Sequence, residues 1–274
     1  MMVDVQSLPD ERQFSIDQVG VNELRYPIIV LDRQLAQQHT IARLSMSVGL
    51  PHHLKGTHMS RFVEILHEQR GELTMRTMPK ILQSVKERLE AETARIEARF
   101  PYFLERCAPV TGARSLMDYD CSFTGSLDRG EMDFVLGTQV PVTSLCPCSK
   151  AISDYGAHNQ RGVIEIDVRS VPAGGGDPSL IWIEELVEIA ERSASAPIYP
   201  LLKRADERHV TMQAFDNPVF VEDMVRNVGL QLRADARVAW CRVKATNDES
   251  IHNHRAFAEL TWNRRHGPRL KSLP

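Results

Sequence analysis

The sequence predicts an α+β fold built as a half-chain repeat, in which an antiparallel sheet carries two helices on one face. Apolar residues alternate with polar ones in several segments, as in half-buried strands, and recur at helical spacing in others. The order strand–strand–helix–helix–strand–strand is followed by strand–helix–helix–strand–strand. At 274 residues the chain is long enough for two fused modules, although the halves share no sequence identity.

The elements of the first half follow from these periodicities. In chain order we expect an N-terminal extended arm over 1–25, strands over 25–32 and 41–50, helices over 57–71 and 79–100, and strands over 113–126 and 131–145. The last two strands are joined by Leu127-Asp128-Arg129-Gly130, which is typical of a hairpin turn. The first module therefore spans 26–150.

The second module is expected over 151–265. Its elements are a strand over 162–171, a flexible loop over 172–178, a helix over 179–192, a turn-rich connection over 193–209, a helix over 218–234, and strands over 237–245 and 256–263. Residues 266–274 form a basic tail that we expect to be disordered.

Composition excludes several functional classes. The net charge of −3 argues against a nucleic-acid-binding surface, and no run is apolar for long enough to span a membrane. The N-terminus lacks the basic and apolar regions of a signal peptide. Five cysteines, an odd number, suit a reducing cytoplasm.

The chemistry is concentrated in the segment 144–161, where Cys146 and Cys148 flank Pro147. The proline favours an extended Cys146, so that both thiols face one side with Cα atoms roughly 6.5–7 Å apart, the upper limit for a disulfide. We therefore expect one metal-binding cysteine and one free thiol. His158 can return to the first thiol across a turn at Gly156. Cysteine with histidine suits a divalent metal, although a two-cysteine turn can also be purely structural.

A second candidate site lies at the start of the helix over 57–71. His58 and Arg61 are three residues apart and share a face of its first turn, where free N–H groups attract anions. A phosphate site and an ordinary solvated first turn both fit this pattern.

Several stretches taken together resemble the bacterial type IB GTP cyclohydrolases. They lie at 56–62, 146–150, 154–161, 201–204, 217–223 and 249–254. The similarity spans roughly residues 25–265, with the glycine-rich loop 173–177 as a local insertion. The joint order of these motifs, rather than any one of them, carries the resemblance.

The resemblance implies a tunnelling fold (T-fold), with two fused modules of antiparallel sheet plus two helices. Subunits of this family assemble, most often as a homotetramer, into a β-barrel with active sites at subunit interfaces. The implied reaction converts GTP and water to 7,8-dihydroneopterin 3'-triphosphate and formate, the first step of tetrahydrofolate and pterin biosynthesis. This is hydrolysis of a cyclic amidine C–N bond, assisted by a divalent metal (manganese, ferrous iron or zinc).

The resemblance also assigns residues to the metal and the proton transfers. Cys146, His158, Glu207 and His252 match the metal-site groups. His158 is either a permanent ligand or an acid–base group. Cys148 resembles the catalytic cysteine, acting as a proton donor or acceptor beside the metal.

Substrate contacts follow in the same way. Glu222 resembles the purine anchor, because one carboxylate can accept both adjacent N–H groups of guanine, with Asp216 and Asp223 as competitors. Candidate triphosphate contacts are His58, Arg61, Lys203 and Arg204.

Other functions remain open at the level of sequence. A nitrile reductase or a pyruvoyl-tetrahydropterin synthase would share the fold, and an archaeal relative would stop at a cyclic phosphate product. From another class, a non-catalytic metal-binding or redox-sensing protein would use Cys146 and Cys148 as sensors.

Overall fold

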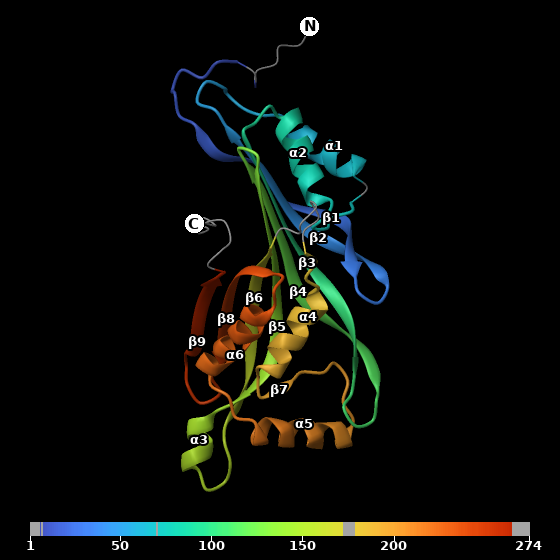
Figure 1. Ribbon diagram of the computed structural model, residues 1–274, viewed down its shortest axis with the longest axis vertical. Helices are drawn as coiled ribbons and strands as arrows, with labels where there is room; N and C mark the ends of the chain where they lie inside the picture. Colours follow the sequence, from blue (N-terminus) through green and yellow to red (C-terminus); the bar gives the residue numbers. More distant parts are fainter. Residues whose placement is uncertain (1–5, 7, 70, 172–178, 265–274) are drawn as a thin grey trace. The chain divides into compact units, whose positions relative to one another are not determined.

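Figure 1 shows the computed structural model, which describes residues 6, 8–69, 71–171 and 179–264. Its elements are β1 (Ile16–Asp32), β2 (Ala36–Leu50), α1 (Met59–Glu68), α2 (Met78–Arg88), β3 (Thr93–Cys107), β4 (Arg114–Asp128), β5 (Glu131–Leu145), α3 (Pro147–Ile152), β6 (Asn159–Ser170), α4 (Ile183–Arg192), β7 (Ala196–Pro197), α5 (Arg204–Asp216), α6 (Val221–Ala234), β8 (Val238–Asp248) and β9 (Arg255–Asn263). Among the described residues, no helix has the length and apolar character needed to cross a bilayer.

The strands form one antiparallel sheet rather than two modular ones. Its order is β1-β2-β3-β4-β5-β6-β8-β9, with the short β7 paired to β5, so that β1 and β9 are open edges. The expected tunnelling fold, with two fused modules closing into a barrel, is therefore wrong for this structure. The predicted order of elements was largely right. The error lay in placing a break after β5, because the hydrogen-bonded ladder continues from β5 into β6.

A two-residue turn joins β4 to β5. Arg129 and Gly130 both have positive φ, 49° and 89°, which is the backbone that a two-residue hairpin turn of the right twist requires. The predicted hairpin at 127–130 is confirmed. It joins two neighbouring strands of 15 residues each.

The helix expected over 79–100 is wrong in its second half. Helix α2 ends at Arg88, and β3 begins at Thr93 with Ala94, Ile96 and Ala98 buried at every second position. This is the period of a strand. The helix end was concealed because Glu90, rather than a glycine, has the positive φ (52°) that usually marks a helix end.

Two further expectations differ from the structure at other points. Strand β1 begins at Ile16, inside the expected arm, and α5 occupies the end of the expected connection over 193–209. Helix α5 buries only Asp206 and Ala214, so it lacks the apolar stripe that predicts a helix. The expected loop over 172–178 and tail over 266–274 lie outside the described residues.

The chain divides into two compact units. The first contains residues 1–101 and 122–136, and the second contains 102–121 and 137–274, so that β3, β4 and β5 contribute to both. The core of the first unit includes Phe62 and Ile65 of α1 and Ile81 and Leu82 of α2. The core of the second includes the apolar faces of α4 and α6. The predicted module boundaries remain a prediction.

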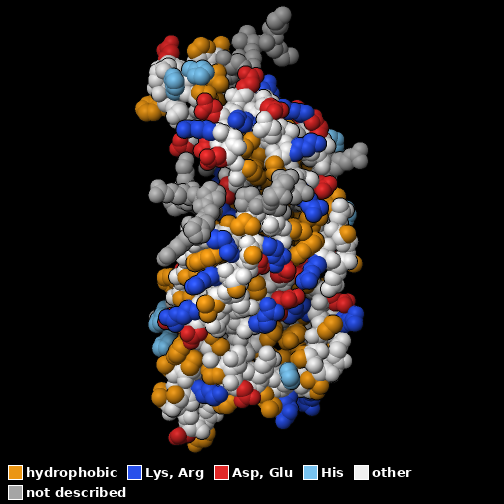
Figure 2. Space-filling model, viewed as in Figure 1, with side chains coloured by type: hydrophobic (Ala, Val, Ile, Leu, Met, Phe, Trp, Pro, Cys, Tyr) orange, Lys and Arg blue, Asp and Glu red, His pale blue; other side chains and the backbone are white. Residues whose placement is uncertain are grey.

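Charged side chains of both signs share the face shown in Figure 2. Basic and acidic side chains of the described residues are interspersed there.

Candidate functional site

The segment that follows β5 is a short helix rather than an extended turn. Cys146 is the N-cap of α3, with an extended backbone (φ −71°, ψ 117°), and its sulfur accepts a hydrogen bond from the Ser149 N–H at 3.4 Å. Pro147 is the first helical residue, a position for which its fixed φ is well suited. The extended Cys146 is thus confirmed. The expected common face of Cys146 and Cys148 on an extended chain is wrong, because Pro147 starts a helix.

Both thiols are free, and they differ in exposure. None of the five cysteines forms a disulfide; Cys148 is exposed and Cys146 is partly buried. The expectation that these two thiols stay unpaired is confirmed. Cys148 lies in the first turn of α3, accessible from solvent, directly beside the more enclosed Cys146.

The backbones of His158 and Cys146 are hydrogen-bonded, whereas the expected contact of the His158 imidazole with the Cys146 thiol stays a prediction. The Cys146 N–H donates to the His158 carbonyl at 3.2 Å, and the His158 N–H donates to the Ser149 hydroxyl at 3.2 Å. Gly156 makes the return possible with a φ of 140°, a value that residues with a Cβ rarely adopt.

The imidazole of His158 is held by a polar chain that comes from two other elements. Its Nδ1 lies 2.6 Å from the Gln160 amide oxygen and 3.3 Å from the Ser250 hydroxyl. The Gln160 amide nitrogen donates to the Glu249 carboxylate at 3.4 Å and to the Ser144 hydroxyl at 3.5 Å. Gln160 is buried, at 8% exposure.

This chain determines which imidazole nitrogen carries the proton. A carboxylate can only accept, so Gln160 turns its nitrogen to Glu249 and its oxygen to His158. The oxygen also only accepts, so Nδ1 of His158 carries the hydrogen. The lone pair is then on Nε2, which is the arrangement found in metal-binding histidines whose other nitrogen is hydrogen-bonded.

Helix α5 carries three of the predicted site residues at its start. Lys203 is the N-cap, and Arg204 and Glu207 follow in the first turn, all three exposed. This end of the helix is anchored by Asp206, whose side chain is fully buried. Its carboxylate accepts the N–H of Lys203 at 2.9 Å, the N–H groups of Val110 and Thr111 at 2.8 and 2.9 Å, and the Thr111 hydroxyl at 2.7 Å.

These contacts set the charge state of Asp206. Burial alone would raise the pKa of its carboxyl, but the hydrogen bonds from the Thr111 hydroxyl and from three backbone N–H groups outweigh burial and lower the pKa well below its ordinary value. The position of Glu207 therefore depends on an ionised neighbour.

We expect Asp206→Asn to destabilise the fold and to flatten its dependence on acid. A single amide oxygen cannot accept four donors, so Tm at pH 7 should fall by on the order of 5 °C. Because the folded-state pKa is lowered, the carboxylate stabilises fully above the unfolded-state value of 3.8, and its contribution is lost as pH falls from there through the folded-state pKa. The variant should lose less stability than the native chain over that range.

Thermal unfolding monitored by circular dichroism from pH 7 to pH 2 measures both effects. Asp216→Asn, an exposed position at the other end of α5, is the matched control. Parallel pH curves for the native chain and Asp206→Asn would contradict the assigned role of Asp206.

The three candidate purine anchors differ in their contacts. Asp223 forms an ion pair with Arg226 at 3.1 Å, one turn along α6. Glu222 is exposed in the first turn of the same helix, and Asp216 is exposed at the end of α5. Among described residues, Glu222 and Asp216 have no such ion pair. Glu222 remains the predicted purine anchor, and Asp223 is disfavoured for this role because its carboxylate is already paired with Arg226.

The predicted metal ligands are not all brought together within one chain. His252 is exposed in the loop between β8 and β9, where its ring stacks on His254 with centroids 5.0 Å apart. In the part of the chain that the structure describes, no three His, Cys, Asp or Glu side chains lie close enough to hold a metal ion. Cys146 and His158 are joined through their backbones, and Glu207 and His252 do not complete a set with them.

The predicted phosphate contacts at α1 lie in the first unit. His58 is the N-cap of α1, and Arg61 donates to the carbonyl of Arg88 at the end of α2. Arg61 thus stabilises a helix end in this structure. Its role in phosphate binding stays a prediction.

Sequence reasoning assigned no role to Gln160 and Glu249. Gln160 follows His158 by two residues, and this spacing places side chains on one face of a strand. Glu249 and Ser250 come just before His252 in a stretch that the resemblance already included. The spacing could have identified Gln160. The contact across 89 residues to Glu249 required the β6–β8 pairing.

The chain is similar to proteins of one family over nearly its whole length. The family model for type I GTP cyclohydrolase FolE2 matches residues 2–258. GTP cyclohydrolase FolE2 of Syntrophotalea carbinolica is 54% identical over 261 residues, covering 95% of each chain. That of Geobacter sulfurreducens is 52% identical, covering 96% of this chain and 99% of the relative.

Similarity to solved structures concerns the fold alone. Uricase from Arthrobacter globiformis superposes with a TM-score of 0.54 at 10% identity, covering 92% of this chain and 95% of that one. Urate oxidase from Bacillus subtilis 168 gives 0.52 at 8% identity, covering 90% and 98%. Both comparisons relate the large antiparallel sheet to known structures without assigning chemistry.

The resemblance predicted from the sequence is thus confirmed for GTP cyclohydrolase. The finer assignment to a tunnelling-fold type IB enzyme is not supported, since the match is to the FolE2 type. With a family model covering 2–258 and relatives above 50% identity, the chain belongs to the type I GTP cyclohydrolase FolE2 family.

Proposed function

We infer that this protein is a metal-dependent GTP cyclohydrolase that converts GTP and water to 7,8-dihydroneopterin 3'-triphosphate and formate, the first step of tetrahydrofolate and pterin biosynthesis. The observation that carries this is the identity of 50–54% to FolE2 relatives over at least 94% of the chain. The backbone contact between Cys146 and His158 and the exposed Cys148 support the proposal, because they bring residues able to bind a metal and transfer protons into one segment.

The donor chemistry fits a divalent metal. The sulfur of Cys146 and Nε2 of His158 are available donors, and Glu207 and His252 add oxygen and nitrogen, a mixture that manganese, ferrous iron or zinc accepts. A metal held there would lower the pKa of a bound water for attack on the purine ring. The polar chain from Glu249 through Gln160 orients the imidazole.

Completion of this set by a second copy of the chain is part of the proposal. One chain does not assemble three ligands among its described residues, so Glu207 and His252 would meet Cys146 and His158 in a homo-oligomer. The surroundings of α3 support this. Ile152 and Tyr155 are 86% and 102% exposed, and large apolar side chains exposed together often mark an interface.

The remaining residues have roles in substrate binding and proton transfer. Glu222 would accept the two adjacent N–H groups of guanine, and Lys203, Arg204, His58 and Arg61 would contact the triphosphate. Cys148 would donate or accept a proton during ring opening.

The test is an anaerobic GTP assay on chelated protein that is re-metallated separately with manganese, ferrous iron and zinc. Release of both formate and an oxidisable fluorescent pterin, restored by metal, is the expected result. A cyclic phosphate product would indicate a different end point. Metal binding without formate under any condition would overturn the proposal in favour of a metal-binding or redox-sensing protein.

Glu222→Gln should weaken GTP binding about tenfold or more and leave metal content unchanged. An amide cannot accept both guanine N–H bonds, and hydrogen bonds to a charged group contribute about 1.5–3 kcal/mol each. Calorimetric titration of metal-free protein with GTP measures the affinity without turnover. Asp223→Asn is the matched control, and unchanged binding by Glu222→Gln would point to Asp216 instead.

Gln160→Leu should retain the fold and lower turnover about 10–100-fold, the usual effect of removing a residue that orients a metal ligand. Without the amide oxygen, Nδ1 of His158 loses its 2.6 Å partner, and Nε2 is no longer fixed as the lone-pair nitrogen. Metal affinity, measured separately by competition with a chromophoric chelator, should fall in parallel. Gln83→Leu, on the exposed face of α2, is the control. Full activity of Gln160→Leu would remove the polar chain from the mechanism.

A further inference from the structure

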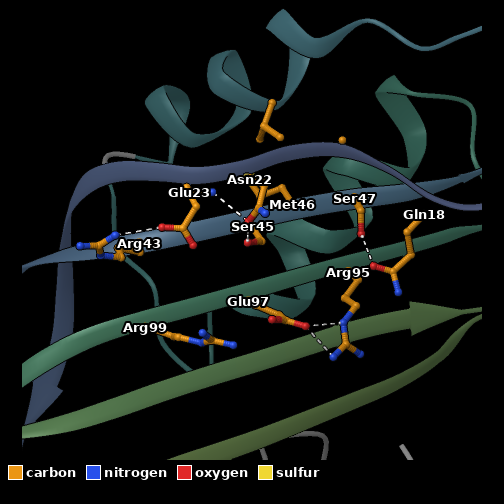
Figure 3. A pocket seen from close by; sticks show the side chains of 12 residues that line it. Gln18, Asn22, Glu23, Arg43, Ser45, Met46, Ser47, Arg95, Glu97 and Arg99 are labelled. Atoms are coloured by element: carbon orange, nitrogen blue, oxygen red, sulfur yellow. Dashed lines mark hydrogen bonds and ion pairs between the residues drawn. The ribbon is translucent and has the colours of Figure 1, made fainter. Parts of the chain in front are cut away.

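The first unit has a polar cavity of about 430 Å³ over β1, β2 and β3 (Figure 3). Leu44, Met46 and Val48 of β2 point into the core, so the alternate residues of that strand face the cavity. The same alternation in β3 turns Arg95, Glu97 and Arg99 to this face. None of these residues is among those assigned to the GTP site.

The cavity arises from irregularities in β1. The pairing of β1 with β2 shifts register between Ile16 and Val19 and again between Val21 and Leu24, and Glu23 has a φ of 55°. Such bulges bend a strand and re-aim its side chains. Gly20 lies so close to β2 that a Cβ there would be 1.9 Å from the Met46 carbonyl oxygen. A side chain at position 20 is therefore excluded.

A row of arginines crosses the three strands beside and within this cavity. Arg25 is directly opposite Arg43, and Arg43 is directly opposite Arg99. Like charges directly opposite on neighbouring strands destabilise a sheet. Only part of this charge is matched: Arg43 pairs with Glu23 at 3.0 Å, whereas Arg25 and Arg99 form no ion pair with any described residue.

The neighbouring pair Arg95 and Glu97 does not neutralise the row. The Arg95 guanidinium is held by Glu97 at 2.7 Å, so this carboxylate is already engaged. Figure 3 shows this interaction and the contact between Arg43 and Glu23, while no dashed line reaches Arg99. The cavity therefore retains excess positive charge.

The uncharged groups of the cavity also present donors. The Asn22 amide oxygen accepts hydrogen bonds from the Glu23 N–H at 2.9 Å and from the Ser45 hydroxyl. The NH₂ group of Asn22 is therefore available as a donor to a ligand. The Gln18 amide oxygen similarly accepts the Ser47 hydroxyl at 3.4 Å. Neither NH₂ group has a hydrogen-bond acceptor among the described residues. The cavity is thus lined by the unmatched guanidinium of Arg99 on β3, by these amide donors on β1, and by Arg43 on β2, which keeps its contact with Glu23.

We propose that this cavity binds a phosphate-bearing small anion, with Arg99 and Arg43 contacting the phosphate oxygens and the Asn22 and Gln18 amides completing the contacts. Donors that approach from several strands suit a tetrahedral oxyanion, and arginine is the side chain best matched to phosphate geometry. The volume is within the range of small-molecule sites. The anion would relieve the repulsion that the arginine row imposes on the sheet.

The test uses the full-length protein and two probes, inorganic phosphate and ribose 5-phosphate, titrated calorimetrically at low ionic strength. We expect saturable binding of one anion per chain that weakens as salt is raised. Arg99→Gln and Arg43→Gln should each weaken binding about tenfold or more, as expected for loss of a charge-assisted contact. Arg129→Gln, an equal charge change in the same unit, should bind as the native chain does. Tighter binding of ribose 5-phosphate would identify a phosphorylated metabolite, and equal binding would identify free phosphate.

Thermal unfolding provides a second readout. Phosphate should raise the Tm of the native chain and of Arg129→Gln but not of Arg99→Gln, because a ligand stabilises only a fold that binds it. Arg99→Gln alone should unfold at or above the native Tm, since it removes one of the opposed charges. Turnover of GTP is measured in the same variants and is expected to be unchanged.

Three outcomes would overturn the proposal. These are the absence of saturable binding, equal weakening in Arg129→Gln, and native phosphate affinity in Arg99→Gln together with a changed molecular mass by light scattering. The last result would assign the arginine row to contact with a second copy of the chain. Because neither probe is a substrate of the proposed reaction, failure here would leave the cyclohydrolase assignment untouched.

Discussion

Replacing Cys146 with alanine is expected to remove most of the bound metal and, with it, at least about 100-fold of the turnover. The thiolate would supply both negative charge and a strong bond to zinc or ferrous iron, and one chain brings only Cys146 and His158 together. Without the Cys146 sulfur, this chain would contribute only His158 to this part of the metal site. Metal per chain, measured by mass spectrometry after anaerobic reconstitution and desalting, is the primary readout.

Cys107→Ala is the matched control for this experiment. Cys107 is an exposed free cysteine of the same unit, at the end of β3, and it is not among the predicted site residues. It should retain native metal content and turnover. Native metal occupancy in Cys146→Ala would contradict the assignment of this thiol as a ligand, even if activity were lost.

The parts of the fold that the sequence predicts well are those where local chemistry and tertiary structure agree. The Arg129-Gly130 hairpin and the alternation in β4, β5 and β6 are examples, because turn chemistry and period-two burial both act within a few residues. The helix prediction failed over 93–100 because α2, which ends at Arg88, is followed by Glu90 rather than by a glycine at the residue with positive φ. Helix α5 was missed because its stability comes from Asp206 and a distant loop rather than from an apolar stripe.

In the candidate site, too, local contacts could be predicted from the sequence and long-range contacts could not. Return of His158 to Cys146 depends on the local turn at Gly156, so the spacing predicts it. The tautomer of His158 depends on Glu249, which lies far along the chain and is brought near by the pairing of β6 with β8. The arginine row likewise exists only in the register of β1, β2 and β3. Long-range register was the information that one sequence lacked.

Register also explains why the modular prediction failed although most elements were right. A half-chain repeat of strands and helices fits two separate sheets and one continuous sheet equally well, since both have the same order along the chain. The distinction depends on whether β5, the last strand of the expected first module, pairs with β6, the first strand of the expected second module. These two strands are neighbours in the sheet, and the ladder extends from β1 to β9.

Cys148→Ala should retain native metal content and lose turnover by about 10²–10⁴-fold, the range typical of a positioned acid–base group. The structure separates its role from that of Cys146. Cys146 is the N-cap of α3, with its sulfur held by the Ser149 N–H, whereas Cys148 is exposed in the first turn and no described residue holds its thiol. Removing it should therefore leave the Cys146–His158 pair intact.

Three measurements on one set of proteins decide between a chemical and a structural role for Cys148. Metal content and GTP affinity should match the native chain, and formate release should be lost. Cys148→Ser, which keeps a weaker proton donor in the same place, should recover part of the rate, whereas a merely structural thiol would tolerate serine and alanine alike. If Cys148→Ala releases formate at the native rate, the proton transfers must be assigned to His158 alone, and the polar chain through Gln160 and Glu249 becomes the feature that tunes them.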